Sequence, residues 1–347
     1  MKVRLHKHTL VFRFPAGTSR GVLKTKPAWL LLFEDGNKKG IGEISRLPGL
    51  SFDENSEFEN RLYRVIEDIN SGKDLKSILN NLIYWPSIHF AVETGLKDLR
   101  SEYHAFVDNW FTKGTDGIPI NGLIWMGDKA WMTRQIDDKL SKGFHCLKMK
   151  IGAIDINTEL NILKDIRKRY SADKLELRVD ANGAFQKEKV MFILDKLAGL
   201  KIHSIEQPVR SGQPELMQKI CANTPVPVAL DEELIGIFDF EQQRELLSYI
   251  SPQYIILKPG LQGGFEICET WMNIADLLKI KYWITSSLES NIGLNAIAQW
   301  TSTLGIRMHQ GLGTGSLYEN NFESPLYIRN DKLWFNPNHV SALNLPK

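Results

Sequence analysis

The segments CLKMKI (146–151) and LELRVDAN (175–182) indicate the fold class most clearly, because each combines strand-like alternation with charges on a single face. Successive side chains of a strand point to opposite faces. Lys148 and Lys150 therefore share one face of the first segment, and Asp180 shares a face with the residues two positions before and after it. The other face of each segment carries Leu, Met, Ile, Val and Ala, which suit packing against helices. The charges are thus expected to point into the interior of a barrel.

Similar segments recur from residue 118 onward and alternate with helical patterns such as TELNILKDIRKRY (158–170). Repeated strand–helix alternation predicts a parallel sheet covered by helices. Eight strands in about 200 residues favour a modified TIM-type (β/α)7β barrel, and an open sheet remains the alternative. The predicted strands are IPINGLI (118–124), HCLKMKI (145–151), LELRVDA (175–181), IHSIEQP (202–208), VPVALDE (226–232), YIILKPG (254–260), YWITSSL (282–288) and IRMHQGL (306–312).

The N-terminal part of the chain has a different pattern. Lys2–Phe14 and Ala28–Phe33 alternate apolar and polar residues, and an Asp-Gly turn joins the second run to Gly40–Ile44. This arrangement predicts antiparallel strands. PAGTSRGVLKTKP (15–27) is polar and contains glycine, so it is expected to be an exposed loop in which Lys24 and Lys26 are solvated.

Helical spacing of apolar residues follows over 53–70 and 86–103. Strands followed by helices predict an α+β capping domain. The expected division is a capping domain over 1–115, a catalytic barrel over 116–316 and a segment over 317–347 that packs back on the capping domain.

Composition argues against several classes of function. The 347 residues are 43% hydrophobic and 24% charged, with a net charge of +2, and the basic residues are dispersed. Neither nucleic acid nor a membrane is therefore an expected partner. Three widely separated cysteines show no zinc-finger spacing, and no signal peptide or spanning segment is visible. These features predict a cytoplasmic protein that acts on a small molecule, and they leave the oligomeric state open.

Polar residues or glycine follow the apolar part of successive predicted strands. In a barrel of this kind the active site lies at the carboxyl ends of the strands, where such residues converge. Burying several charges together requires mutual compensation. The positions concerned are Lys148, Lys150, Asp180, Glu206, Asp231, Lys258, Ser286 and Gly311.

Three of these residues form a candidate metal site. Asp180, Glu206 and Asp231 come from three consecutive units and are expected to be neighbours at the rim. Hard oxygen ligands without His or Cys suit Mg²⁺, and Mn²⁺ would fit the same site. Lys150 and Lys258 would face each other across the barrel. A nearby cation and partial burial lower the pKa of a lysine from about 10.4, which produces a usable base.

The ordered motifs KMK (148–150), RVDAN (178–182), IEQP (205–208), LDE (230–232) and ILKPG (256–260) resemble the muconate-lactonising subgroup of the enolase superfamily. The resemblance covers nearly the whole chain. It implies the barrel with its capping domain, and a reaction that begins with removal of the proton next to a substrate carboxylate.

The resemblance also implies roles for individual residues. Lys150 would remove the α-proton, and Lys258 would stabilise the enediolate as a cation. Mg²⁺ would be bound by the three carboxylates named above. Lys148 and Asn182 would support the site, and Glu232 would lie beside the metal ligands or face solvent.

A narrower resemblance rests on INGLIWMG (120–127), TSSLESNIG (285–293) and GLGTG (311–315). These runs are similar to members of the subgroup that dehydrate a cyclohexadiene carboxylate with a succinyl tail. Lys150 would then return a proton to the departing hydroxyl on the same face. The resemblance further implies that the loop over 15–27 closes over the substrate. The implied substrate-binding residues are Arg178, Ser286, Ser287, Gly311 and Arg20.

Several other functions fit the same residues and remain open. N-acylamino acid racemases and dipeptide epimerases need the same metal and two opposed lysines, and muconate cycloisomerisation occurs on the same scaffold. GLGTGSL (311–317) lacks the acidic pair expected of a dipeptide epimerase. A non-catalytic metal-binding barrel is an alternative of another class. His203, His309 and Cys146 are interpreted as core or packing residues without a ligand role.

Overall fold

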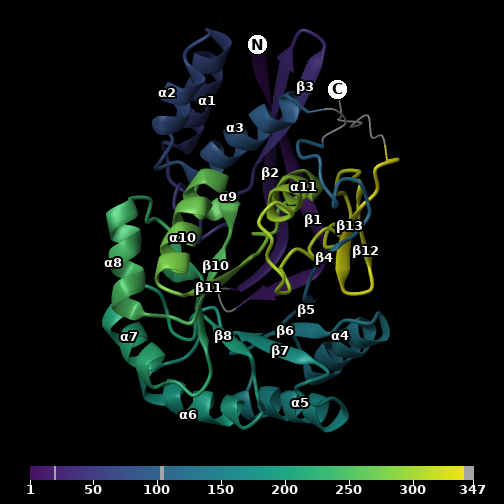
Figure 1. Ribbon diagram of the computed structural model, residues 1–347, viewed down its shortest axis with the longest axis vertical. Helices are drawn as coiled ribbons and strands as arrows, with labels where there is room; N and C mark the ends of the chain where they lie inside the picture. Colours follow the sequence, from purple (N-terminus) through teal and green to yellow (C-terminus); the bar gives the residue numbers. More distant parts are fainter. Residues whose placement is uncertain (19–20, 102–104, 340–347) are drawn as a thin grey trace.

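A computed structural model describes residues 1–18, 21–101 and 105–339. Figure 1 shows an antiparallel sheet packed with helices at one end of the molecule and a curled sheet surrounded by helices at the other. The strands are β1 (Lys2–Thr18), β2 (Gly21–Asp35), β3 (Lys38–Ile44), β4 (Ile118–Pro119), β5 (Gly122–Ile124), β6 (Cys146–Lys150), β7 (Glu176–Asp180), β8 (Ser204–Glu206), β9 (Val228–Leu230), β10 (Tyr254–Leu257), β11 (Lys281–Ile284), β12 (Leu326–Arg329) and β13 (Lys332–Phe335). The helices are α1 (Phe58–Asn70), α2 (Leu75–Asn80), α3 (Pro86–Leu99), α4 (Lys129–Ser141), α5 (Ile156–Arg169), α6 (Lys187–Ala198), α7 (Pro214–Asn223), η1 (Glu232–Leu234), α8 (Phe240–Ile250), α9 (Pro259–Gln262), α10 (Phe265–Leu277) and α11 (Asn291–Thr301).

The larger sheet forms the barrel that the strand–helix alternation predicts. Its seven strands are parallel and run in the order β5 to β11 without a crossover. The eighth predicted strand is reduced to two bridging residues: Gly311 pairs with Thr285, and Gln310 pairs with Ile120 beside β5. These bridges close the ring, so the (β/α)7β prediction is confirmed. The predicted strand over 118–124 is divided, because β4 pairs with β13 outside the barrel.

The barrel helices begin where short polar side chains satisfy free backbone N–H groups. Asp128 accepts a hydrogen bond from Trp131 N at the start of α4, and Asp155 accepts one from Thr158 N at the start of α5. Ser290 does the same for α11. Such N-caps each stabilise a helix by about 1 kcal/mol. The apolar faces of these helices pack against the outward-facing residues of the barrel strands in one large core.

The capping sheet has the order β1-β2-β3, and its hairpin is much longer than predicted. The segment 15–27 is not a loop: the β1–β2 pairing shifts its register between Val11 and Ala16 and then continues to Thr18 opposite Gly21. The bulge interrupts the alternation that would have marked a strand. Lys26 is fully buried rather than solvated. The hairpin arm therefore carries the sheet to the mouth of the barrel.

Helix α3 packs closely on the capping sheet and shows why β3 contains glycine. A Cβ atom added at Gly42 would lie 1.7 Å from the carbonyl oxygen of Ala91 on α3, so only glycine allows this approach. Helix α3 ends at Leu99, before the end of the predicted helix over 86–103, of which residues 102–103 lie outside the described part. Helix α1 begins at Phe58, five positions into the predicted helix over 53–70.

The C-terminal part of the chain contacts both halves of the molecule. Phe12 of β1 bridges to Tyr318, and Val11 accepts a hydrogen bond from Glu319 N. Strands β12 and β13 form a small sheet with β4. The expected domain boundaries stay a prediction. Among the described residues, no helix combines the length and apolar character that crossing a bilayer requires.

Glu93 of α3 joins the capping domain to the barrel and leads to a pH prediction. Its Oε2 accepts a 2.7 Å hydrogen bond from Phe265 N at the start of α10. Burial raises the pKa of this carboxyl group to about 7, and the charges of Glu269 and Glu266 also raise it. The hydrogen bond from Phe265 N and the charge of Lys97 lower the pKa but do not outweigh burial.

The folded protein therefore holds this proton between pH 4.5 and 7, where the unfolded chain has lost it, and stability falls as pH rises through this window. We expect the unfolding free energy of Glu93→Gln, relative to that of the unsubstituted protein, to increase by about 1–2 kcal/mol from pH 5 to pH 8. The increase is smaller than the full pKa shift implies, because Glu93 is only partly buried. Urea unfolding at both pH values measures the difference. A constant difference would contradict this account of Glu93.

Candidate active site

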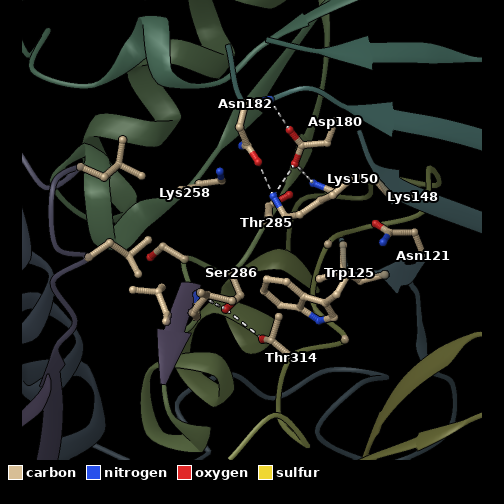
Figure 2. A pocket seen from close by; sticks show the side chains of 18 of the residues that line it. Asn121, Trp125, Lys148, Lys150, Asp180, Asn182, Lys258, Thr285, Ser286 and Thr314 are labelled. Carbon is tan, nitrogen blue, oxygen red and sulfur yellow. Dashed lines mark hydrogen bonds and ion pairs between the residues drawn. The ribbon is translucent and has the colours of Figure 1, made fainter. Parts of the chain in front are cut away.

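The carboxyl ends of the barrel strands converge on a cavity of about 290 Å³ beneath the capping domain. Figure 2 shows Lys150 and Lys258 projecting from two sides of this cavity, with Asp180 and Asn182 between them and Trp125, Ser286 and Thr314 toward the other end.

The two lysines of β6 contact the carboxylates of the next two strands. Lys148 Nζ lies 2.7 Å from Glu206 Oε2 and 3.3 Å from Asp180 Oδ2. Lys150 Nζ lies 3.0 Å from Asp180 Oδ2 and 2.6 Å from Asn182 Oδ1. All five of these residues are at most 8% exposed, and the side chain of Lys150, taken alone, is 11% exposed. The period-two alternation therefore places both lysines inward, as expected.

On the opposite side, Lys258 follows β10 and donates to Asp231, and its Nζ lies 3.9 Å from Glu206 Oε1. Asn182 Nδ2 donates to Glu232 Oε1 at 3.1 Å, so these two side chains connect the ends of β7 and β9. The structure thus brings together the predicted catalytic lysines, metal-binding carboxylates and supporting residues.

The electrostatic balance of this cluster sets the protonation of its members. Burial alone would raise the pKa of Asp180, but Lys150, Lys148 and Lys258 outweigh burial and hold the pKa well below its usual range. Burial would lower the pKa of Lys258, yet Asp231 and neighbouring carboxylates raise it. The pKa of Asp231 is raised, chiefly by burial.

The carboxylate oxygens provide a test of whether a divalent cation fits. Glu206 Oε1 and Asp231 Oδ1 are buried and accept no hydrogen bond in the described structure, although Lys258 lies 3.9 Å from the first of them. Buried acceptors without donors are costly. A hard cation would satisfy both oxygens, and three carboxylates form the donor set that Mg²⁺ prefers.

The carboxylates are more widely spread than in a formed metal site. They do not present one oxygen each within 4.8 Å of one another, because Lys148 lies between Asp180 and Glu206, and Lys258 lies between Glu206 and Asp231. Metal binding therefore requires these ammonium groups to move aside, and the donor chemistry fits Mg²⁺ once they do.

The remaining cavity wall combines apolar residues, hydroxyl groups and glycine. Ser286, Ser287 and Gly311 line it, as the narrower resemblance implies. Arg20 lies outside the described residues, and its neighbours Gly21 to Leu23 line the wall. Lining residues without a role in our sequence analysis are Asn121, Leu123, Trp125, Thr285, Leu288, Gly313 and Thr314 from the barrel, and Leu47, Pro48 and Leu50 from the capping domain.

Arg178 differs from the expectation that it binds substrate. Its side chain is 1% exposed and does not line the cavity. The Nε atom lies 2.6 Å from Glu176 Oε1, and an Nη atom donates to the carbonyl of His309 at 2.9 Å. The guanidinium also lies 4.4 Å from the ring centroid of Trp283. Arg178 is thus directed toward the amino ends of the strands, away from the reacting groups.

Trp125 is a site residue that sequence reasoning missed. Lys150 Nζ lies 5.9 Å from the centroid of its ring, so the indole limits the space around this amine. The residue belongs to the INGLIWMG run, and its place directly after the first barrel strand was the available signal. The apolar wall from the capping domain had no comparable signal.

A buried network connects the cavity to the capping domain. Ser286 Oγ donates to Glu289 Oε2 at 2.6 Å, and Ser287 Oγ donates to Glu289 Oε1. Glu43 of β3 accepts a 2.9 Å hydrogen bond from Ser290 N, and it lies near the buried ammonium group of Lys26. Glu289 therefore sets the orientation of two hydroxyl groups that line the cavity.

Glu289→Gln should raise KM for the substrate about 10-fold with little change in kcat, because a hydrogen bond to a charged acceptor contributes roughly 1.5 kcal/mol or more. Steady-state kinetics tests this expectation, with Glu266→Gln as the control because Glu266 is exposed on α10. A fall in kcat at unchanged KM would instead place Glu289 in the chemical step.

Comparisons with known proteins agree with this geometry. The family described as "Enolase C-terminal domain-like" matches residues 131–336. The o-succinylbenzoate synthase of Desulfotalea psychrophila is 43% identical over 361 residues, which cover 94% of this chain and 97% of that protein. The crystal structure of MenC from Desulfotalea psychrophila LSv54 superposes with a TM-score of 0.82 at 39% identity, covering 96% of this chain and 99% of that chain.

The L-Ala-D/L-Glu epimerase of Bacillus subtilis is a more distant relative, 24% identical over 86% of this chain and 80% of its own. Its substrate-liganded structure also has a TM-score of 0.82, over 96% of each chain, but at 22% identity this likeness shows the fold alone. The chain therefore belongs to the enolase superfamily. Within that superfamily it belongs to the family of the o-succinylbenzoate synthases, which are lyases.

Proposed function

We propose that this enzyme dehydrates 2-succinyl-6-hydroxy-2,4-cyclohexadiene-1-carboxylate to o-succinylbenzoate in menaquinone biosynthesis. The proposal rests on the 43% identity over nearly the whole chain and on the composition of the cavity wall. We further propose Mg²⁺ as the cofactor and the cytoplasm as the location. The three cysteines of the chain are free, which suits a reducing compartment.

Lys150 is the group that moves the proton. Its neutral amine takes the proton from the carbon that bears the carboxylate, and its ammonium form then protonates the hydroxyl that leaves from the same face. Water departs, the ring gains its last double bond, and Lys150 returns to its starting state. Asn182 Oδ1, 2.6 Å from Lys150 Nζ, orients the amine for both transfers.

Charge on the substrate is balanced by fixed groups. The ammonium group of Lys258 offsets the negative charge that develops on the substrate carboxylate, and the lining hydroxyl groups of Ser286 and Ser287 are placed to bind the succinyl tail. Asp180, Glu206 and Asp231 would hold Mg²⁺, with Asn182 and Glu232 as neighbours of these ligands. When bound, Mg²⁺ would lower the energy of the deprotonated substrate by neutralising its carboxylate oxygens.

The cavity wall is the observation that favours dehydration over dipeptide epimerisation. Among the described lining residues, Asp180 is the sole carboxylate, and it lies in the lysine cluster. A dipeptide carries an ammonium group that requires an acidic partner, whereas the Leu, Trp, Ser and Thr side chains of this wall suit an uncharged ring with an anionic tail.

Turnover of the cyclohexadiene carboxylate by purified protein, with and without Mg²⁺, tests the proposal. We expect metal-dependent loss of diene absorbance and formation of o-succinylbenzoate, identified by mass. Absence of turnover in the presence of bound Mg²⁺ would contradict the proposed reaction and leave the superfamily assignment intact.

A further inference from the structure

The amino end of the barrel contains a second group of potential metal ligands, remote from the cavity. Cys146 begins β6, Glu176 begins β7, and His309 directly precedes the two bridging residues of the eighth strand. One donor atom from each of these residues lies within 4.8 Å of the other two. Cys146 lies four residues before Lys150, which places this group about 13 Å from the catalytic amine along the strand.

Two of the three side chains are in direct contact, and the third lies close to them. Cys146 Sγ lies 3.3 Å from Glu176 Oε1, and the two residues are paired across β6 and β7. Cys146 is fully buried, whereas the side chains of Glu176 and His309 are 28% and 23% exposed. A solvated ion can therefore reach the site from the carboxylate and imidazole side, and the thiol closes the inner side.

The surroundings contain the partners that metal ligands commonly have. His309 Nε2 lies 3.8 Å from Asp331 Oδ2, so this carboxylate is placed beside the imidazole as the outer partner of a ligating histidine commonly is. Asp331 is held in turn by His145 Nδ1 at 2.8 Å. His203 Nδ1 lies 3.9 Å from Glu176 Oε1, and it would have to exchange its 3.0 Å hydrogen bond with Ser204 Oγ to act as a further nitrogen ligand.

We propose that Cys146, Glu176 and His309 form a binding site for a zinc-class divalent cation at the amino end of the barrel. Thiolate, imidazole and carboxylate are the three ligand types of Zn²⁺, and three of them leave one position for water or His203. This donor set differs from the oxygen-only catalytic site, so the two sites take different ions. The bound ion would join β6, β7 and the eighth strand, which in the described part of the chain is paired with its neighbours through two bridges.

Arg178 is the group that opposes cation binding. Its Nε lies 2.6 Å from the same carboxylate oxygen that faces Cys146. A thiolate and a carboxylate supply two negative charges, and Asp331 adds a third, which together balance Zn²⁺ and one guanidinium. Binding displaces the thiol proton of Cys146, because the thiolate is the form of cysteine that ligates a metal.

Cobalt titration of the Mg²⁺-saturated protein distinguishes this site from the catalytic one. Co²⁺ bound through a thiolate gives an intense near-ultraviolet charge-transfer band, which an oxygen-only site cannot produce. We expect the band to appear with one Co²⁺ per chain and to disappear on addition of Zn²⁺. It should be lost in Cys146→Ser and retained in Cys268→Ser. Cys268 is a matched control because it is also fully buried, with its Sγ 3.4 Å from Gln262 Oε1.

His309→Gln provides a second test in case Cys146→Ser folds poorly, since His309 is partly exposed. Loss of a residue that supports a metal ligand typically lowers metal affinity by ~10- to 100-fold. We expect His309→Gln, which removes a proposed ligand, to lower Co²⁺ affinity by more than this. We expect Asp331→Asn to lower it within this range. The proposal is overturned if the unsubstituted protein shows no thiolate band, if the band survives in Cys146→Ser, or if His309→Gln leaves the affinity unchanged.

Discussion

Replacing Lys150 with alanine should lower kcat for dehydration by about 10³-fold or more while the fold and Mg²⁺ binding are retained. General acid–base catalysis typically contributes 10²–10⁴-fold, and here one amine both removes and returns the proton. Asp180 and Asn182, which contact Lys150 Nζ, are unchanged in this variant and are still in place to bind the metal and water. The effect is measured by single-turnover kinetics at saturating substrate, with circular dichroism as the check on folding.

Lys281→Ala is the control for this substitution, because Lys281 belongs to barrel strand β11 but is exposed at its amino end. We expect its kcat to match that of the unsubstituted enzyme. Retention of kcat in Lys150→Ala would exclude Lys150 as the base.

Glu206→Gln should have the second largest effect on activity, and it should also lower the stability of the protein. The substitution removes a metal ligand, so we expect kcat/KM to fall by at least about 100-fold and the Mg²⁺ requirement to rise. It also leaves Lys148, now 2.7 Å from a glutamate oxygen, with Asp180 as its remaining anionic partner. Uncompensated buried charge is costly, so the metal-free variant should lose about 3 kcal/mol of unfolding free energy.

Isothermal titration with Mg²⁺ and urea unfolding in the presence of a chelator measure these two consequences. Glu233→Gln is the matched control, since Glu233 is also buried but accepts hydrogen bonds from Gln207 and Gly212 rather than from a lysine. If both variants bound Mg²⁺ equally well, Glu206 would not be a ligand.

The barrel and most of its catalytic cluster could be predicted because both depend on local periodicity. Alternation at period two placed Lys148, Lys150 and Asp180 inside, and strand–helix repetition brought the strand ends together. Arg178 shares the inward face with Asp180 but lies two residues, or about 6–7 Å, nearer the amino end. Face alone therefore could not distinguish a cavity residue from one that contacts Glu176.

Features that depend on long-range packing could not be predicted. The bond between Glu43 and Ser290 spans 247 positions, and Leu47 and Leu50 reach the cavity only through the placement of the capping domain. The sequence predicts a loop over 15–27, whereas the structure has a strand arm there, because a bulge disturbs the alternation. The sequence likewise indicates core or packing roles for Cys146 and His309, since their proximity exists only in the closed barrel.

Dehydration and its rival reactions can be compared on one preparation of the enzyme with Mg²⁺. The comparison measures kcat/KM for dehydration of the cyclohexadiene carboxylate, for racemisation of N-acylamino acids and for epimerisation of L-Ala-L-Glu. A lining with Asp180 as its sole described carboxylate predicts efficient dehydration and no measurable dipeptide epimerisation. Racemisation or epimerisation without dehydration would contradict the account, because it would show that this site exchanges the α-proton but does not expel the hydroxyl group.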